Sequence, residues 1–268
     1  MTGDVGVLAS GGCHIFSGCG FPAPGLQDFE WKPLFSIGSF DFTKPMLLAI
    51  LAALVVIVFF WVAFRSPKMV PRGMQNLGEI AILGVRDQIL RPSLGRKGDS
   101  YLPFLVSLFF FIYIMNVMEL IPVFQFPVTS RIGFVWPMVF IVYFLYLYLG
   151  VKHQGAWGYL RNMVPPGVPG PIYIILVPVE LLRFFVFQPF TLGVRLFGNM
   201  FAGHLLLTIF TIATWYLLSL SVGLVYAAGS FALAIFVFLL ETLVTLLQAF
   251  IFTTLTATYI ASSVEPAH

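Results

Sequence analysis

Three ionisable side chains stand apart in the long apolar stretch near the end of this sequence. Between Phe184 and Val264, only Arg195, His204 and Glu241 are ionisable at ordinary pH. A charged residue at the centre of a membrane-spanning helix costs about 2.5–3.5 kcal/mol on insertion scales, so such residues usually face a partner or a water-filled path. Histidine suits proton transfer, whereas arginine keeps its proton. The set therefore predicts proton movement; a buried ion pair that only fixes helix packing is the alternative.

The spacing of the polar residues gives them distinct places on two helices. Arg195 and Asn199 are four residues apart and share one helix face. His204 lies nine residues after Arg195, about 13 Å along the axis and half a turn round, so the two residues face different surroundings. In the final apolar segment, three polar residues at i, i+4 and i+7 form one stripe: Glu241, Thr245 and Gln248.

An antiparallel packing of these two segments would bring their polar residues opposite one another. Facing residues in such a pair share a nearly constant sum of residue numbers. The sums for Arg195 with Gln248 and for His204 with Glu241 agree to within two residues, which is about 3 Å of helix rise. The implied turn lies near residues 221–222. We therefore predict an Arg–Gln level deeper in the membrane and a His–Glu level nearer the outside.

The composition requires a membrane. Hydrophobic residues make up 59% of the chain and charged residues 9%, and the mean hydropathy is +0.97. Soluble domains carry about 25% charged residues. Several continuous apolar runs reach the roughly 20 residues that a spanning helix needs, and they lack the alternation of a membrane β-barrel. The net charge is +3, and the basic residues are scattered through loops, which fits binding to lipid headgroups rather than to nucleic acid.

We predict an all-α polytopic membrane protein with about five transmembrane helices and one interfacial amphipathic helix. The last two helices are expected to be long, tilted and antiparallel, because the core is only about 30 Å thick. The chain is expected to divide into a loop-like extracytoplasmic tail at 1–44 and a single membrane domain at 45–268. Within the membrane domain we expect a first span at 46–64, the interfacial helix at 71–92, a helical hairpin at 101–151 and the long helix pair at 172–262.

Basic residues set the expected orientation. Arg65, Lys68 and Arg72 directly follow the first span and mark its cytoplasmic end. The N-terminus is therefore expected outside and, after five crossings, the C-terminus in the cytoplasm. Cys13 and Cys19 precede the first span. They could form a small disulfide loop or stand as two free thiols, and the sequence is compatible with both interpretations.

Three sequence runs carry a resemblance to a known family. The run PFTLGVRLFGNM at 189–200 and the run LQAFIF at 247–252 resemble the signatures of subunit a of the rotary F-type ATP synthase. Asn116, followed by the run ELIP at 119–122, resembles the hairpin turn of that family. The resemblance extends over roughly residues 46–262. It implies a non-catalytic subunit in which two aqueous half-channels load and unload the carboxylates of a rotating c ring.

The family resemblance also implies roles for individual residues. The arginine that matches Arg195 faces the ring and separates the half-channels, and Asn199 and Gln248 belong to the same motifs. Many bacterial members carry Glu where this chain has His204 and His where it has Glu241, so the pair keeps one acid and one imidazole. Possible channel-lining residues are Asn116, Glu119, Glu180 and Thr245. Among them, Glu180 is one residue off the usual spacing from the arginine, and Asn116 could equally be a packing residue.

The resemblance implies partners and a location as well. The expected partners are the c-subunit ring, b-type peripheral stalk subunits, the lipid bilayer and protons, with protons rather than sodium ions as the family default. No cofactor and no metal are expected. The bacterial plasma membrane is favoured over the mitochondrial inner membrane.

Two other classes of membrane protein were weighed. A proton-coupled secondary transporter with its own substrate site would favour an internal repeat or paired broken helices, and the sequence shows neither. A membrane enzyme would need a nucleophile–base set or a metal-ligand spacing such as His-Glu-x-x-His, which is absent.

Overall fold

The computed structural model describes residue 21 and residues 35–37, 40–121, 124, 128–155, 157–159, 170–218 and 223–264. This part of the chain is almost entirely helical, which confirms the predicted all-α class. It contains five helices long and apolar enough to cross a membrane: Lys44–Phe64, Met74–Val117, Ile132–Gln154, Ile174–Leu217 and Gly223–Val264.

The N-terminal tail is less irregular than the sequence indicated. Strand β1 (Phe35–Ile37) pairs antiparallel with β2 (Phe40–Phe42), with Phe35 opposite Phe42. The prediction of a loop-like tail is therefore wrong for this segment. Its Phe-Ser-Ile and Phe-Asp-Phe runs alternate apolar and polar residues, which favours strands. Cys13 and Cys19 lie outside the described residues.

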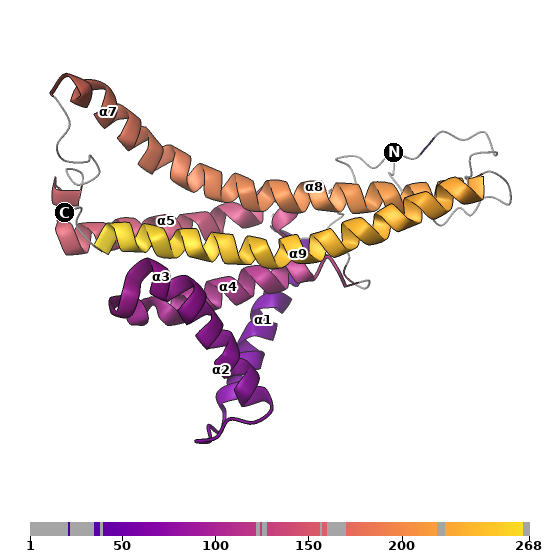
Figure 1. Cartoon of the computed structure of the whole chain (residues 1–268), viewed down its shortest axis with the longest axis horizontal. Helices are drawn as coiled ribbons and strands as arrows, with labels where there is room; N and C mark the ends of the chain where they lie inside the picture. Colours follow the sequence, from indigo (N-terminus) through magenta and orange to yellow (C-terminus); the bar gives the residue numbers. More distant parts are fainter. Residues whose placement is uncertain are drawn as a thin grey trace.

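The first two helices form an arm that projects from the rest of the molecule (Figure 1). Helix α1 (Lys44–Phe64) carries a proline in its first turn, where no helical N–H is lost. Helix α2 (Met74–Val85) packs against α1. At Gly78, a Cβ would lie 2.9 Å from the Cβ of Ala63, so the glycine permits this close approach. Whether α2 lies at the membrane interface stays a prediction.

A bent helical connection joins this arm to the main bundle. It consists of a π-helical turn η3 (Arg86–Leu90), α3 (Arg91–Leu94) and a 3-10 turn η4 (Gly95–Tyr101), and it leads into α4 (Leu102–Val117). Both η3 and α3 pack against α9. Asp99 lies 3.6 Å from Arg86 and 3.5 Å from Arg91, so its carboxylate holds two turns of the connection together.

The bundle consists of α4, α5 (Ile132–Gln154), α8 (Gln188–Leu217) and α9 (Gly223–Val264). Helix α7 (Gly170–Leu182) continues through the π-helical turn η6 (Arg183–Phe187) into α8, which gives one long bent helix (Figure 1). Apolar side chains at the centre of the bundle are almost fully buried: Leu105, Ile112, Val139, Leu196, Phe252 and Ile260.

The long helices α8 and α9 run antiparallel along most of their length (Figure 1). Near one end, the hydroxyl of Ser230 donates a hydrogen bond to the carbonyl oxygen of Phe210, at 3.0 Å. The turn predicted near residues 221–222 lies outside the described residues. This pair holds the three isolated ionisable residues of the sequence, and its register decides which of them meet.

Candidate functional site

The polar stripe of α9 is buried inside the bundle. Glu241, Thr245 and Gln248 all face neighbouring helices rather than the surface. The hydroxyl of Thr245 donates a hydrogen bond to the backbone carbonyl of Glu241, at 2.8 Å, so this hydroxyl already has a partner within α9. Glu241 Oε1 and Gln248 Nε2 are buried and make no hydrogen bond within the described part of the chain. The stripe therefore keeps two polar atoms open to a ligand or to water.

Gln248 meets Asn199 across the helix pair. The Nδ2 atom of Asn199 donates a hydrogen bond to Oε1 of Gln248, at 2.9 Å. The sequence predicted that Arg195 would lie opposite Gln248, so the observed partner is one helical turn further along α8. The difference arises because the sequence argument treats both helices as straight and ignores side-chain reach. The antiparallel register itself is correct to about one turn.

Arg195 lies on an exposed face of α8. Its guanidinium group makes no hydrogen bond and no ion pair with any residue that the structure describes; it interacts only electrostatically, with Tyr259 of α9. Its exposed neighbours on the helix include Phe190 and Val194. A permanent cation is thus presented on a largely apolar surface, which is costly in a membrane unless another molecule supplies an anion.

His204 pairs with Glu119, which the sequence offered only as a possible lining residue. The Nδ1 atom of His204 lies 3.0 Å from Oε1 of Glu119. The side chain of Glu119 is 1% exposed and that of His204 is 16% exposed. Glu119 follows the end of α4, and its backbone N–H donates to the carbonyl of Asn116 in the last turn of that helix.

Glu241 approaches the same site from the opposite helix. Its carboxyl group packs directly against Gly203, where a Cβ would overlap it. Gly203 is the residue before His204, and the charges of Glu119 and Glu241 are close enough to interact. Two acids and one imidazole, from the turn after α4 and from helices α8 and α9, therefore form one cluster, here called the acid–imidazole cluster: Glu119, His204 and Glu241. The predicted pairing of His204 with Glu241 becomes a group of three.

Two other predicted residues have structural partners. Asn116 is fully buried and accepts a hydrogen bond from the Thr129 hydroxyl through its Oδ1 atom, at 2.6 Å. This bond holds the end of α4, and hence the turn that carries Glu119, to η5 (Val128–Ser130). Glu180 of α7 forms an ion pair with Arg183, at 3.1 Å. It does not join the acid–imidazole cluster.

Sequence reasoning missed Gly203 entirely. A glycine inside a helix is destabilising by about 0.5–1 kcal/mol relative to alanine, so it needs a reason. The reason here is the carboxyl group of Glu241, which occupies the space of the missing side chain. The signal was present, because the residue numbers of Gly203 and Glu241 fit the same antiparallel register as the predicted pairs.

The cluster suits proton transfer. Imidazole can accept a proton on one nitrogen while it donates from the other, and carboxyl groups can exchange protons with it directly or through water. Within the described residues, no group of three or more His, Cys, Asp or Glu side chains is placed to hold a metal ion. The side chains at this site, one imidazole and two carboxyl groups, are of the types that exchange protons.

Comparison with known proteins gives one consistent result. Residues 46–261 match the family model for the ATP synthase A chain. The chain is 44% identical to ATP synthase subunit a of Streptomyces lividans over 262 residues, which cover 96% of this chain and 92% of the relative. It is 40% identical to the subunit a of Frankia alni (91% and 86% covered) and 39% identical to that of Rhodococcus erythropolis (90% and 89% covered).

Proposed function

Because the chain belongs to the ATP synthase subunit a family, we propose that it is the stator that carries protons to and from the carboxylates of a rotating c ring. It is a multi-pass membrane component of the ATP synthase. Our proposal adds the route. Protons enter through the acid–imidazole cluster, load a ring carboxylate, travel with the ring and leave on the other side of Arg195. The subunit itself then catalyses no bond chemistry.

The observation that carries this proposal is the placement of Arg195. The other ionisable groups of the long helix pair, His204 and Glu241, lie in the cluster, whereas Arg195 has no anion within the described residues. A carboxylate supplied by a partner chain would offset the cost of leaving this cation on an apolar surface. Arginine stays protonated at any relevant pH, so it attracts a carboxylate and promotes its ionisation but does not pass a proton on.

The cluster and Arg195 lie at different levels of the helix pair, as two separate half-channels require. The nine residues between Arg195 and His204 correspond to about 13 Å of helix. A proton at the cluster therefore cannot reach the far side of Arg195 in one hydrogen-bonded step. We propose that the ring carboxylate bridges this gap as it passes, which makes transport and rotation one process.

The proposed topology agrees with the contacts of the helix ends. The Nζ atom of Lys44, at the start of α1, donates to the carbonyl oxygen of Phe124 in the connection between α4 and α5, at 3.1 Å. These two segments lie at the end predicted to face outward, and Glu119 is in the same connection. We propose that the acid–imidazole cluster opens to this side of a bacterial plasma membrane, with the C-terminus in the cytoplasm and b-type stalk subunits as further partners.

Purification of the intact complex tests this function. The tagged chain, extracted from its own membranes in mild detergent, should co-purify with an oligomeric proteolipid ring that carries one membrane carboxylate per chain. Vesicles made from cells that lack the chain should lose proton-driven ATP synthesis, and a plasmid copy should restore it. A purified complex without a ring, or undiminished synthesis in the deletion strain, would contradict the proposal.

A further inference from the structure

Two arginines in the bent connection between the arm and the bundle share one carboxylate. An oxygen of Asp99 lies 3.6 Å from the guanidinium group of Arg86 and 3.5 Å from that of Arg91. Both distances exceed the usual range of about 2.7–3.2 Å for an N–H···O hydrogen bond, so the carboxylate holds both arginines loosely. The Nε atoms of both arginines are buried and make no hydrogen bond within the described part of the chain. The pair therefore has more donors than its one acid uses.

The backbone of the connection places the two arginines on one face. Residues five apart in an α-helix point about 140° away from each other. In the π-helical turn η3, the backbone N–H of Arg91 donates to the carbonyl oxygen of Arg86, so these two residues stand one turn apart. The chain then turns at Gly95, whose φ of 61° favours glycine, and η4 brings Asp99 to both arginines. The arrangement thus follows from the local fold.

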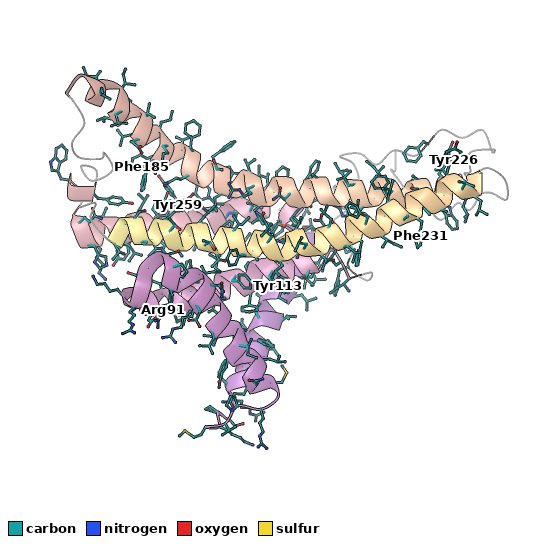
Figure 2. The ribbon with its side chains drawn as sticks, viewed as in Figure 1. Arg91, Tyr113, Phe185, Tyr226, Phe231 and Tyr259 are labelled. Atoms are coloured by element: carbon teal, nitrogen blue, oxygen red, sulfur yellow. The ribbon has the colours of Figure 1, made fainter. Side chains whose placement is uncertain are left out.

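The same connection has an excess of positive charge. Between residues 86 and 99 it carries four basic residues and two acids: Arg86, Arg91, Arg96 and Lys97 against Asp87 and Asp99. The side chains of Arg86 and Arg91 are 32% and 30% exposed, and Arg96 and Lys97 are exposed on η4. Figure 2 shows Arg91 on the side of α3 that faces away from α9. An anion can therefore reach this group from the surface, and the excess charge attracts it.

A row of apolar side chains on α2 leads to the two arginines. Its members follow one another every three residues and are 43–58% exposed: Met74, Leu77, Ile80 and Leu83. Residues three apart are neighbours on a helix surface, and Arg86 stands three residues after Leu83. We call this row the α2 stripe. An apolar row that ends at a basic pair fits a molecule with a hydrocarbon chain and an anionic head, whereas a free anion would need no such row.

We propose that Arg86 and Arg91 bind the phosphate of an anionic phospholipid, and that an acyl chain of this lipid lies along the α2 stripe. Guanidinium groups suit phosphate oxygens, which accept two parallel hydrogen bonds from one arginine. The predicted orientation places the connection at the cytoplasmic face, where anionic lipids attract basic residues. The turns η3 and α3 pack against α9, whereas α2 packs against α1, so one lipid would join the arm to the bundle.

Photolabelling of the intact complex tests this site. The complex is reconstituted into phosphatidylcholine vesicles that contain a phosphatidylglycerol with a photoreactive group on one acyl chain. Irradiation should label the peptide that carries residues 74–86, because the reactive chain lies along the α2 stripe. Excess unlabelled phosphatidylglycerol should suppress the labelling. Excess phosphatidylcholine and inorganic phosphate should not, since the first carries a compensating cation and the second has no acyl chain.

Removal of the two charges should weaken the labelling. Arg86→Gln combined with Arg91→Gln should lower it about thirtyfold, since each arginine near an anionic lipid surface contributes about fivefold. The matched control is Arg65→Gln combined with Arg72→Gln, which removes the same charge from exposed residues between α1 and α2. This control should label as the unchanged protein does. Co-purification of the ring verifies assembly of every variant.

The change Asp99→Asn acts in the opposite direction. It removes the acid that competes with the phosphate for both arginines, so labelling should rise about fivefold. An acid that only joins the turns of the connection would give no increase. Because this variant keeps all four basic residues, it tests the site even where the double arginine variant does not assemble.

The remaining outcomes contradict the lipid site. Unchanged labelling in an assembled Arg86→Gln, Arg91→Gln variant would overturn it, and so would the absence of an increase in Asp99→Asn. Equal suppression by phosphatidylcholine would indicate unselective lipid contact, and suppression by inorganic phosphate would indicate a site for a free anion. The site lies outside the acid–imidazole cluster and the Arg195 surface, so its failure would leave the proposed function in place.

Discussion

The acid–imidazole cluster and the Arg195 surface both involve the helix pair α8 and α9, yet their ionisable groups differ in whether they have partners within the chain. In the cluster, the buried acids Glu119 and Glu241 and the part-buried His204 come from the turn after α4 and from two helices, and they interact with one another. On the surface, Arg195 is exposed and has no hydrogen bond or ion pair to the described chain. Groups that this chain pairs internally suit an internal path, whereas a cation left open on an apolar face suits a partner. The contrast separates what the subunit does alone from what it does with the ring.

The largest effect inside the cluster should come from removal of the Glu241 carboxyl. Glu241→Gln keeps the size of the side chain but cannot exchange a proton as an acid does. Since positioned acid–base groups contribute about 100-fold or more to proton transfer, synthesis should fall by about that factor. The control Thr242→Ala changes the next residue, which is exposed and bonded to its own helix. If Glu241→Gln instead makes ATP from a proton gradient at a rate within twofold of wild type, Glu241 takes no part in proton transfer.

An exchange of the two partners tests whether the cluster works as a unit. His204→Glu alone places three acids together, and Glu241→His alone leaves two imidazoles beside Glu119. The double variant restores a cluster of one imidazole and two acids, so it should retain about tenfold more flux than the worse single variant. Proton pumping in vesicles measures all three. A double variant no better than the worse single variant would show that the residues act independently.

A methyl group at position 203 tests the contact between α8 and Glu241. In Gly203→Ala the Cβ overlaps the Glu241 carboxyl, which must move away from His204. Overpacking of about 1 kcal/mol corresponds to about a fivefold loss of synthesis. The matched control is Gly229→Ala, because a Cβ at that glycine of α9 meets nothing within 4 Å. Equal activity of the two variants would mean that the Gly203–Glu241 contact does not position the acid.

The smallest effect should come from the support of Glu119. Thr129→Val removes the hydroxyl that donates to Asn116 and leaves a buried amide oxygen without that donor. The expected loss of stability is about 1 kcal/mol, seen as a lower temperature of thermal inactivation of the purified complex, with synthesis at low temperature nearly unchanged. Thr258→Val is the control, since its exposed hydroxyl bonds only within α9. A large loss of synthesis at low temperature would instead give Thr129 a direct part in the path.

Local spacing in the sequence predicted much of the long helix pair. The polar stripe of α9 and the isolated residues of α8 predicted an antiparallel register, and Asn199–Gln248 confirms it to about one turn. The bond between His204 and Glu119 could not be predicted this way, because 85 residues separate them and their meeting depends on how α4 packs.

The difference between the two regions depends above all on Arg195, and one measurement tests it directly. Vesicles that carry Arg195→Ala should make no ATP from a proton gradient, although the protein is inserted at normal levels by blot. Arg195→Lys should also fail, because it loses the planar fork and can release its proton when desolvated. Arg65→Ala, which removes an arginine that lies over the ring of Trp61 at the end of α1, should synthesise ATP normally. Near-normal synthesis in Arg195→Ala, at normal protein levels and without a second-site change, would contradict the proposed role of this surface.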